Sequence, residues 1–215
     1  MNTKFPSSAQ PIKLYRNPKS GHSHRAELMM ALLDIPYETI DLDMTNGAHK
    51  APDYLEISPF GQVPAIDDND TTLSDSNGIL VYLVTRYGND HEWLPIDPVK
   101  AANVQRWLSV AAGEIAYGPC SARLVTVFGA DLDWDNARTI ANNLFIVLEK
   151  ALSRSAFLTG ESITIADVAG YSYIAHAPEG GISLEPYLNI KAWLKRIEAQ
   201  PRFIGMATSP LPETI

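Results

Sequence analysis

The residues from Phe60 to Ser76 combine features that suit an extended ligand with a carboxylate at one end. Asp75 and Ser76 stand where a helix begins, and free N–H groups and the positive end of a helix dipole attract anions there. A cis bond between Val63 and Pro64 would turn the polar backbone groups of Val63 outward from the strand ladder. A peptide could then pair with Val63 and place its carboxylate at Ser76. The helix is indicated by apolar residues at helical spacing, namely Ile79, Leu80, Leu83, Val84 and Tyr87.

A second group of polar residues, S-G-H-S-H-R from Ser20 onward, follows the first predicted strand. Ser20 lies at the turn before a predicted helix, and Ser23 is the better candidate for the N-cap of that helix. His22 and His24 do not share a helix face, and no carboxylate cluster joins them, so we expect no metal site. Taken alone, both groups favour a simpler interpretation, in which they form caps and turns without a ligand.

The whole chain indicates an ordinary globular protein of one large or two small domains. Its 215 residues can bury a substantial core, and a net charge of −8 argues against binding to nucleic acid. Cys120 is the single cysteine, which excludes an internal disulfide and a C-x-x-C redox pair. The first residues carry no apolar leader, and no apolar run has the length of a membrane span. We therefore expect a cytoplasmic protein without a membrane or nucleic-acid partner.

The first half of the chain predicts a four-stranded mixed sheet with helices packed on it. A strand, a helix and a second strand over this length form a βαβ unit, so the first two strands should be parallel. A polar loop with a short irregular helix follows, then two antiparallel strands and the helix that begins at Ser76. The order β-α-β-α-β-β-α is the thioredoxin-like arrangement. The predicted strands are residues 12–15, 39–43, 65–67 and 72–74.

The second half predicts helices only. A proline-punctuated connector runs from Gly88 to Pro98, and beyond it apolar residues recur at helical spacing. T-I-A-D-V at Thr164 to Val168 fits a capping box in which Thr164 caps and Asp167 reaches back, and it starts a helix toward His176. The expected organisation is a thioredoxin-like domain at 1–88, a linker at 89–97 and an all-helical domain at 98–215.

Four motifs in this order resemble the cytosolic glutathione S-transferases over nearly the whole chain. The similarity is to a bacterial, serine-type branch with a phi- or theta-like active-site pattern. The motifs are H-K-A-P-D-Y-L at 49–55, S-P-F-G-Q-V-P-A at 58–65, D-S at 75–76 and F-L-T-G-E-S-I-T-I-A-D-V at 157–168. D-S replaces the family's usual E-S, which shortens the acidic side chain by one methylene. The resemblance implies glutathione as co-substrate and no metal.

The resemblance places the thiol-activating hydroxyl at Ser20, with Ser23 as the alternative. A free thiol has a pKa of about 8.5, and its thiolate is the nucleophile, so lowering that pKa by about two units takes roughly 2.7 kcal/mol. A hydrogen bond to a charged group supplies roughly 1.5–3 kcal/mol, and a helix N-terminus adds about 0.3–1 kcal/mol. Ser20 at the head of a helix could provide both. The resemblance assigns glutathione binding to His49, Lys50, Gln62, Val63, Pro64, Asp75 and Ser76.

The resemblance also implies an electrophile pocket between the two halves, along the first long helix of the second half. Residues that are aromatic or small at helical spacing are more often core than pocket. A tyrosine or histidine of a later helix, Tyr173 or His176, could join the pocket. The candidate substrate-binding residues are Trp107, Ala111, Glu114 and Tyr117.

The leading functional hypothesis is an enzyme that conjugates glutathione to small hydrophobic electrophiles, as in detoxification. The family also implies a homodimer. A glutathione-dependent peroxidase or reductase is the first alternative, although no cysteine near Ser20 can form a mixed disulfide. A non-catalytic interaction module on the same fold is the second alternative. The joint presence of Ser20, His49, Gln62, Pro64 and Ser76 favours a working glutathione site.

Overall fold

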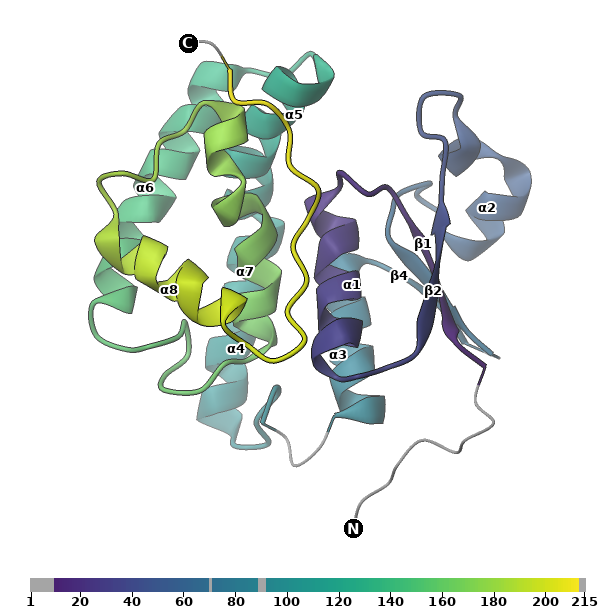
Figure 1. Ribbon diagram of the computed structural model, residues 1–215, viewed down its shortest axis with the longest axis horizontal. Coiled ribbons are helices and arrows are strands. Elements are labelled where there is room, and N and C mark those ends of the chain that lie inside the picture. The colour runs from purple at the N-terminus through teal and green to yellow at the C-terminus, as the bar shows by residue number, and fades with distance from the viewer. Residues whose placement is uncertain (1–9, 70, 89–91, 213–215) are drawn as a thin grey trace.

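The computed structural model describes residues 10–69, 71–88 and 92–212, which form an N-terminal α/β domain and a helical C-terminal domain (Figure 1). Residue 70 in the predicted acidic turn and residues 89–91 of the predicted connector lie outside the described residues. The sheet has the order β2-β1-β3-β4. Its strands are β1 (Ile12–Arg16), β2 (Tyr37–Asp41), β3 (Ala65–Asp68) and β4 (Thr71–Ser74).

The strand pairing confirms the predicted thioredoxin-like arrangement. β1 runs parallel to β2 and antiparallel to β3, so Leu14 pairs with Thr39 on one side and with Ile66 on the other. β3 and β4 form an antiparallel hairpin. β2 begins two residues earlier than predicted, because its register with β1 starts at Ile12 opposite Tyr37.

Helices cover the sheet on both sides. α1 (Gly21–Leu32) and α3 (Ser76–Tyr87) pack against each other on the face toward the C-terminal domain, where α1 buries Leu28, Met29 and Met30. On the other side, η1 (Ala48–Lys50) and α2 (Pro52–Ile57) form the predicted irregular segment between β2 and β3.

The described part of the second half is helical, as predicted, and α7 forms its centre. Every residue of α7 from Ile165 to Ile174 is buried, and α7 contacts both α1 and α4. α5 was not predicted, because A-Y-G-P-C before it reads as a helix break; the chain continues there through one wide π-helical turn. The helices are α4 (Pro98–Ala112), η2 (Ala116–Cys120), α5 (Ser121–Phe128), α6 (Trp134–Leu152), α7 (Ile165–Ala175), η3 (Ala177–Gly180) and α8 (Leu188–Glu198).

The predicted capping box at the start of α7 is confirmed. The Thr164 side chain accepts a hydrogen bond from the Ala166 amide, and the Asp167 carboxylate accepts one from the Thr164 amide at 2.8 Å. Asp167 is fully buried and also accepts from the Leu158 amide at 2.8 Å and from the Trp193 indole at 2.9 Å. One carboxylate thus joins the loop before α7, α7 itself and α8.

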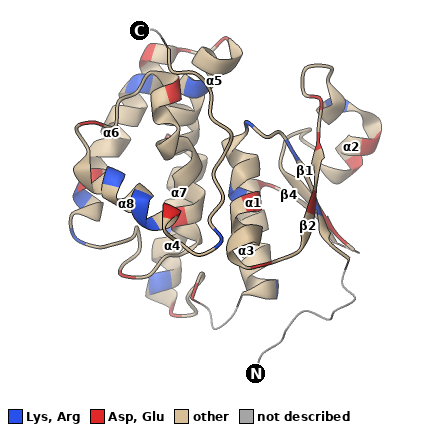
Figure 2. Ribbon diagram, viewed as in Figure 1, with Lys and Arg blue, Asp and Glu red and all other residues tan. Residues whose placement is uncertain are grey.

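The C-terminal segment, residues 203–212, runs in extended form between α1 and the helical domain (Figure 1). It carries no charged side chain, in contrast to most of the surface elements (Figure 2). The imidazole of His24, on α1, bonds Ser172 on α7 at 2.8 Å and the Ile204 carbonyl at 2.9 Å. His24 therefore links the two domains and this segment. None of the helices within the described ranges has the length and apolar character to cross a bilayer.

Candidate active site

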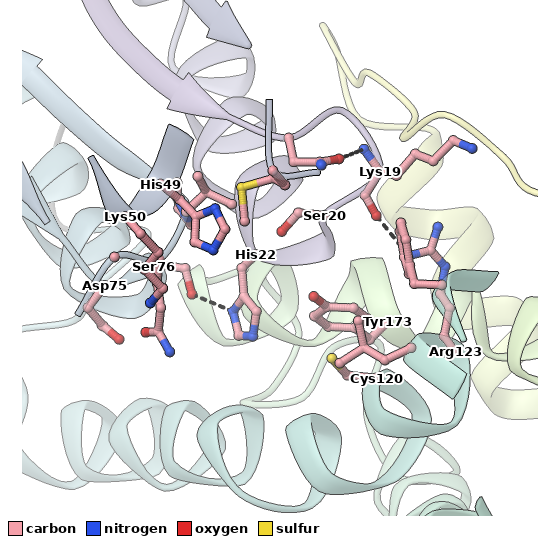
Figure 3. Close-up of a pocket in the computed structure, with 18 residues that line it drawn as sticks. Lys19, Ser20, His22, His49, Lys50, Asp75, Ser76, Cys120, Arg123 and Tyr173 are labelled. Carbon is pink, nitrogen blue, oxygen red and sulfur yellow. Dashed lines mark hydrogen bonds between the residues drawn. The ribbon is translucent and has the colours of Figure 1, made fainter. Parts of the chain in front are cut away.

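A cleft of about 560 Å³ lies between the two domains, and Figure 3 shows the side chains that line it. Residues from distant parts of the sequence meet there, from the end of β1, the η1 loop, the turn before β3, the start of α3, α5 and α7. The cleft brings together the following predicted site residues: Ser20, His49, Lys50, Gln62, Val63, Pro64, Asp75 and Ser76.

Ser20, and not Ser23, caps α1, so the predicted N-cap was wrong by three residues. The turn after β1 brings the chain into helical conformation at Gly21, and the Ser20 hydroxyl oxygen accepts the Ser23 amide at 3.2 Å. The Ser23 side chain is buried, accepts the Asn17 amide at 3.3 Å and does not line the cleft. Among the described residues the structure gives no acceptor for the Ser20 hydroxyl proton. That proton is available to a ligand.

Gly21 allows α7 to approach the head of α1. A Cβ atom at this position would lie 2.8 Å from the Tyr173 ring, far inside van der Waals contact. The glycine therefore lets Tyr173 close the cleft beside Ser20, as Figure 3 shows. Tyr173 was one of two residues predicted to reach the cleft from this helix; the other, His176, bonds Glu179 instead and does not line it.

The start of α3 carries the second half of the site. Asp75 caps the helix by accepting the Gly78 amide at 2.7 Å, and its φ of 82° is uncommon for a residue with a side chain. The Ser76 hydroxyl accepts from the Arg25 guanidinium at 3.0 Å and lies 2.9 Å from the His22 imidazole. Strained backbone of this kind concentrates at functional sites.

Arg25 places a positive charge directly behind Ser76, a feature that the sequence did not reveal. Its side chain is almost fully buried, and its Nη1 also donates to the Asn77 side chain at 3.1 Å. Nε and Nη2 have no hydrogen-bond partner within the described residues. Burial lowers the pKa of Arg25 from its ordinary value. An unpaired buried cation is costly, and a bound anion nearby would offset that cost.

His22 and His24 should make the protein sensitive to mild acid. Burial lowers the pKa of His22 to about 3, with a contribution from Arg25, and burial lowers that of His24 to about 4. Both folded values lie below the ordinary histidine value, so only the unfolded chain takes up these protons as the pH falls through 6.5. We expect the free energy of unfolding to drop by roughly 2 kcal/mol between pH 7 and pH 5.5.

Urea unfolding at the two pH values measures this drop. His22→Asn keeps a side-chain oxygen near Ser76 but removes one titrating ring, so it should lose about half of the pH dependence. A free energy of unfolding that stays constant between pH 7 and pH 5.5 in the unaltered chain would contradict the prediction.

The loop before β3 is held in shape by a glycine and a lysine. Gly61 has a φ of 58°, and a Cβ there would lie 2.6 Å from the His49 carbonyl oxygen. The Lys50 ammonium donates to the Phe60 carbonyl at 3.0 Å. These contacts place η1 against the turn that precedes the Val63–Pro64 bond, which is cis.

The described lining of the cleft is basic, although the chain is acidic overall. It includes three cationic side chains, Lys19, Lys50 and Arg123, and one carboxylate, Asp75, against a net charge of −8 for the whole chain. This local balance suits an anionic ligand. In the described part of the chain, no three His, Cys, Asp or Glu residues are grouped so as to hold a metal ion.

The predicted electrophile-binding residues do not reach this cleft, and the prediction has to be corrected. Trp107 and Glu114 line a separate groove between α4 and α6, Ala111 lies in the core, and the Tyr117 side chain is 66% exposed. The chain turns at the π-helical segment so that α5, rather than α4, borders the cleft. The residues on this side are Cys120, Arg123, Leu124, Phe128 and Tyr173.

The comparisons with known proteins agree with this fold and site. Residues 10–85 match the model "Glutathione S-transferase, N-terminal domain", and residues 129–201 match "Glutathione S-transferase, C-terminal domain". The chain is 32% identical to glutathione S-transferase 3 of Zea mays, over 94% of this chain and 96% of that protein.

Two solved structures show the same architecture. A glutathione S-transferase from Pseudomonas fluorescens superimposes with a TM-score of 0.86 at 30% identity, covering 92% of this chain and 99% of the other. A glutathione transferase homolog from Drosophila mojavensis, solved with bound glutathione, gives 0.80 at 26% identity and covers 89% of each chain. The chain therefore belongs to the glutathione S-transferase family and is an enzyme of that class.

Proposed function

We propose that the protein transfers glutathione, as a thiolate stabilised by the Ser20 hydroxyl, to small hydrophobic electrophiles. The observation that carries the proposal is the Ser20 hydroxyl, which lies at the N-terminus of α1, lines the cleft and donates to no protein acceptor among the described residues. A donor in this position favours the thiolate over the thiol. Ser20 thus binds the sulfur without attacking the substrate itself.

The remaining cleft residues suit the two ends of glutathione. Asp75 and Ser76, with the Arg25 charge behind them, would hold the γ-glutamyl end, where a carboxylate meets the start of α3. His49 and Lys50 would hold the glycine carboxylate. Between them, the Val63 backbone and the Gln62 side chain would hold the middle of the tripeptide.

The electrophile would lie against the α5 and α7 side of the cleft. Leu124, Phe128 and Tyr173 offer apolar contact there, next to Ser20. Burial raises the pKa of the Cys120 thiol, which keeps it protonated and poorly reactive. This supports conjugation to an apolar electrophile rather than thiol exchange on the protein. We also propose the cytoplasm as its location, since one cysteine permits no internal disulfide.

Titrating glutathione into the purified protein tests the proposal, with the ultraviolet absorbance of the thiolate followed against pH. We expect binding and a fall of about two units in the pKa of the glutathione thiol. Conjugation is then measured with an aromatic halide. If the protein binds glutathione and reduces a hydroperoxide but does not conjugate the aromatic halide, it is a peroxidase and the proposed transferase activity is refuted. A chain that fails to bind glutathione would be an interaction module.

We propose in addition that the protein is a homodimer in which each copy's Phe60 seats in the other copy's groove between α4 and α6. Phe60 is 80% exposed, at the tip of the loop before β3. The groove has a volume of about 600 Å³. Its lining combines the apolar residues Trp107, Val110, Leu144 and Val147 with the charged residues Arg106, Glu114, Lys150 and Arg154. An exposed aromatic residue and a groove with apolar residues on one molecule can pack against each other across a two-fold axis.

Phe60→Lys should convert this dimer into monomers, because it removes the aromatic ring and brings an ammonium group toward Arg106, Lys150 and Arg154, which also line the groove. Size-exclusion chromatography with light scattering measures the change in mass. Leu188→Lys, at a position 69% exposed on α8, is the matched control and should stay dimeric. An unaltered chain with the mass of a monomer would refute the dimer, and a Phe60→Lys dimer would refute the role of this loop.

A further inference from the structure

Arg123 is a buried arginine of the C-terminal domain that reaches the backbone of the N-terminal domain. Its side chain is 1% exposed. Nε donates to the Glu179 carboxylate at 2.6 Å, Nη1 donates to the Lys19 carbonyl at 2.8 Å, and Nη2 lies 3.5 Å from the Ser209 hydroxyl. Figure 3 shows the bond to Lys19 beside Ser20. One guanidinium thus connects α5, η3, the C-terminal segment and the turn before α1.

Glu179 fixes the direction of the Arg123 side chain. Its second oxygen accepts the Ser209 amide at 2.9 Å and lies 2.6 Å from Nδ1 of His176. Burial alone would raise the pKa of Glu179, but the hydrogen bonds from Ser209, His176 and Arg123 outweigh burial and lower it. The carboxylate is therefore charged and held from three directions, which leaves the guanidinium little freedom to turn.

The bond from Arg123 falls on the peptide unit that leads directly into Ser20. The carbonyl of this unit belongs to Lys19, and its N–H belongs to Ser20 and donates to the Asn17 carbonyl at 2.9 Å. A peptide unit is planar, so two bonds on opposite sides fix its orientation. The carbonyl of Ser20 is bound in turn by the His24 amide at 2.9 Å. Arg123 supplies the only one of these three anchors that comes from the other domain.

We propose that Arg123 is a positioning residue for the Ser20 hydroxyl and that Glu179 and the C-terminal segment, through Ser209, hold it in place. The inference rests on the proposed function, in which Ser20 stabilises the glutathione thiolate. Arg123 acts on the peptide before Ser20 and not on the sulfur. Because a hydrogen bond weakens steeply with misalignment, a small rotation of this peptide would weaken the bond from Ser20 to the thiolate.

Arg123 also lines the cleft, so it could instead serve only as part of the wall against the electrophile. The two roles predict different kinetics. A wall residue changes KM for the electrophile and leaves the ionisation of bound glutathione unchanged. A positioning residue changes the pKa of the bound thiol even when no electrophile is present.

Arg123→Lys is the test variant, because it keeps the positive charge and cannot reach all three partners at once. We expect the pKa of bound glutathione to rise by about half a unit to one unit, which means three- to tenfold less thiolate at a pH below that pKa. The Kd of glutathione should change less than threefold. Arg138→Lys is the matched control, since Arg138 is half-exposed on α6 and pairs with Asp135 on the surface.

A second variant tests the C-terminal segment and protects the proposal against a folding defect in Arg123→Lys. A chain that ends at Thr208 lacks Ser209 and should show a shift in the same direction, whereas a chain that ends at Leu211 keeps Ser209 and should match the full chain. Amide hydrogen exchange of residues 17–24, without ligand, should be faster in Arg123→Lys and in the shorter chain. This measurement needs no activity.

The outcomes separate the inference from the proposed function. If the unaltered chain lowers the pKa of the thiol while Arg123→Lys and the chain ending at Thr208 do so equally well, the positioning role is refuted and the function stands. A changed KM for the electrophile alone assigns Arg123 to the wall and also refutes it. If the unaltered chain leaves the pKa of the thiol unchanged, the proposed function and the inference both fall, whatever the exchange rates.

Discussion

Replacing Ser20 with alanine should lower kcat/KM for conjugation at neutral pH by about ten- to a hundredfold, whereas Ser23→Ala should leave it within about threefold. The expected loss corresponds to the roughly 1.5–3 kcal/mol that a hydrogen bond to a charged group contributes. Ser20 faces the cleft with an available proton, while the Ser23 hydroxyl is buried and accepts the Asn17 amide. The two serines lie three residues apart and have separate tasks.

The pKa of bound glutathione, read from thiolate absorbance, separates loss of chemistry from loss of fold. In Ser20→Ala this pKa should return toward about 8.5, the value of a free thiol. Both variants should also lose about 1 kcal/mol of stability, Ser20→Ala because it removes a helix cap and Ser23→Ala because it leaves the partly buried Asn17 amide without its acceptor. A bound thiol pKa that stays low in Ser20→Ala and rises in Ser23→Ala would reverse the assignment.

Asp167→Asn should cause the largest loss of stability among the changes considered, about 3 kcal/mol. One oxygen of an asparagine can still accept from the Leu158 amide and the Trp193 indole, as Oδ1 of Asp167 does. The amide nitrogen would then face the Thr164 amide, a second donor, where Oδ2 now accepts at 2.8 Å. The asparagine nitrogen could donate only to the Thr164 hydroxyl oxygen, which lies 3.3 Å from Oδ2, and the Thr164 amide at the head of the central helix would lose its acceptor.

Thermal unfolding measures this loss, and for a chain of this size we expect a fall in Tm of roughly 6–12 °C. Asp135→Asn is the matched control. Asp135 lies in the first turn of α6 with its side chain 79% exposed and should change Tm by less than about 2 °C. A Tm of Asp167→Asn within that same range would show that the capping box contributes little to the stability of this domain.

The sequence predicted the fold well because its main determinants are local. Residues close together in the sequence specify each of the four strands, the cap at Thr164 and the helices that follow. The anion site at Asp75 and Ser76 was also a local inference, because a helix start provides N–H groups whatever surrounds it. The structure brings both residues to the cleft.

The parts of the site that the sequence did not reveal depend on how distant elements meet. α5 borders the cleft because of the wide turn at Gly118 and Pro119, and spacing along one helix does not encode the direction of the next. Arg25 follows His24 in a helix that faces both domains, and only the packed structure shows that its charge lies behind Ser76. The choice of Ser23 as cap failed for a simpler reason. Two serines follow β1, and the residue type alone does not decide whether the helix begins after Ser20 or after Ser23.

The C-terminal segment has a consequence for how the molecule is made. The N-terminal domain leaves the ribosome first, when α7 and residues 203–212, which will lie against α1, have not yet been synthesised. The nascent chain therefore passes through a stage in which one face of α1 is bare and Ser20 has no opposing wall. A product of premature termination would keep this exposed face, which is the kind of surface that chaperones bind. In the order of synthesis, the cleft gains its α5 and α7 side only after the N-terminal domain has been made.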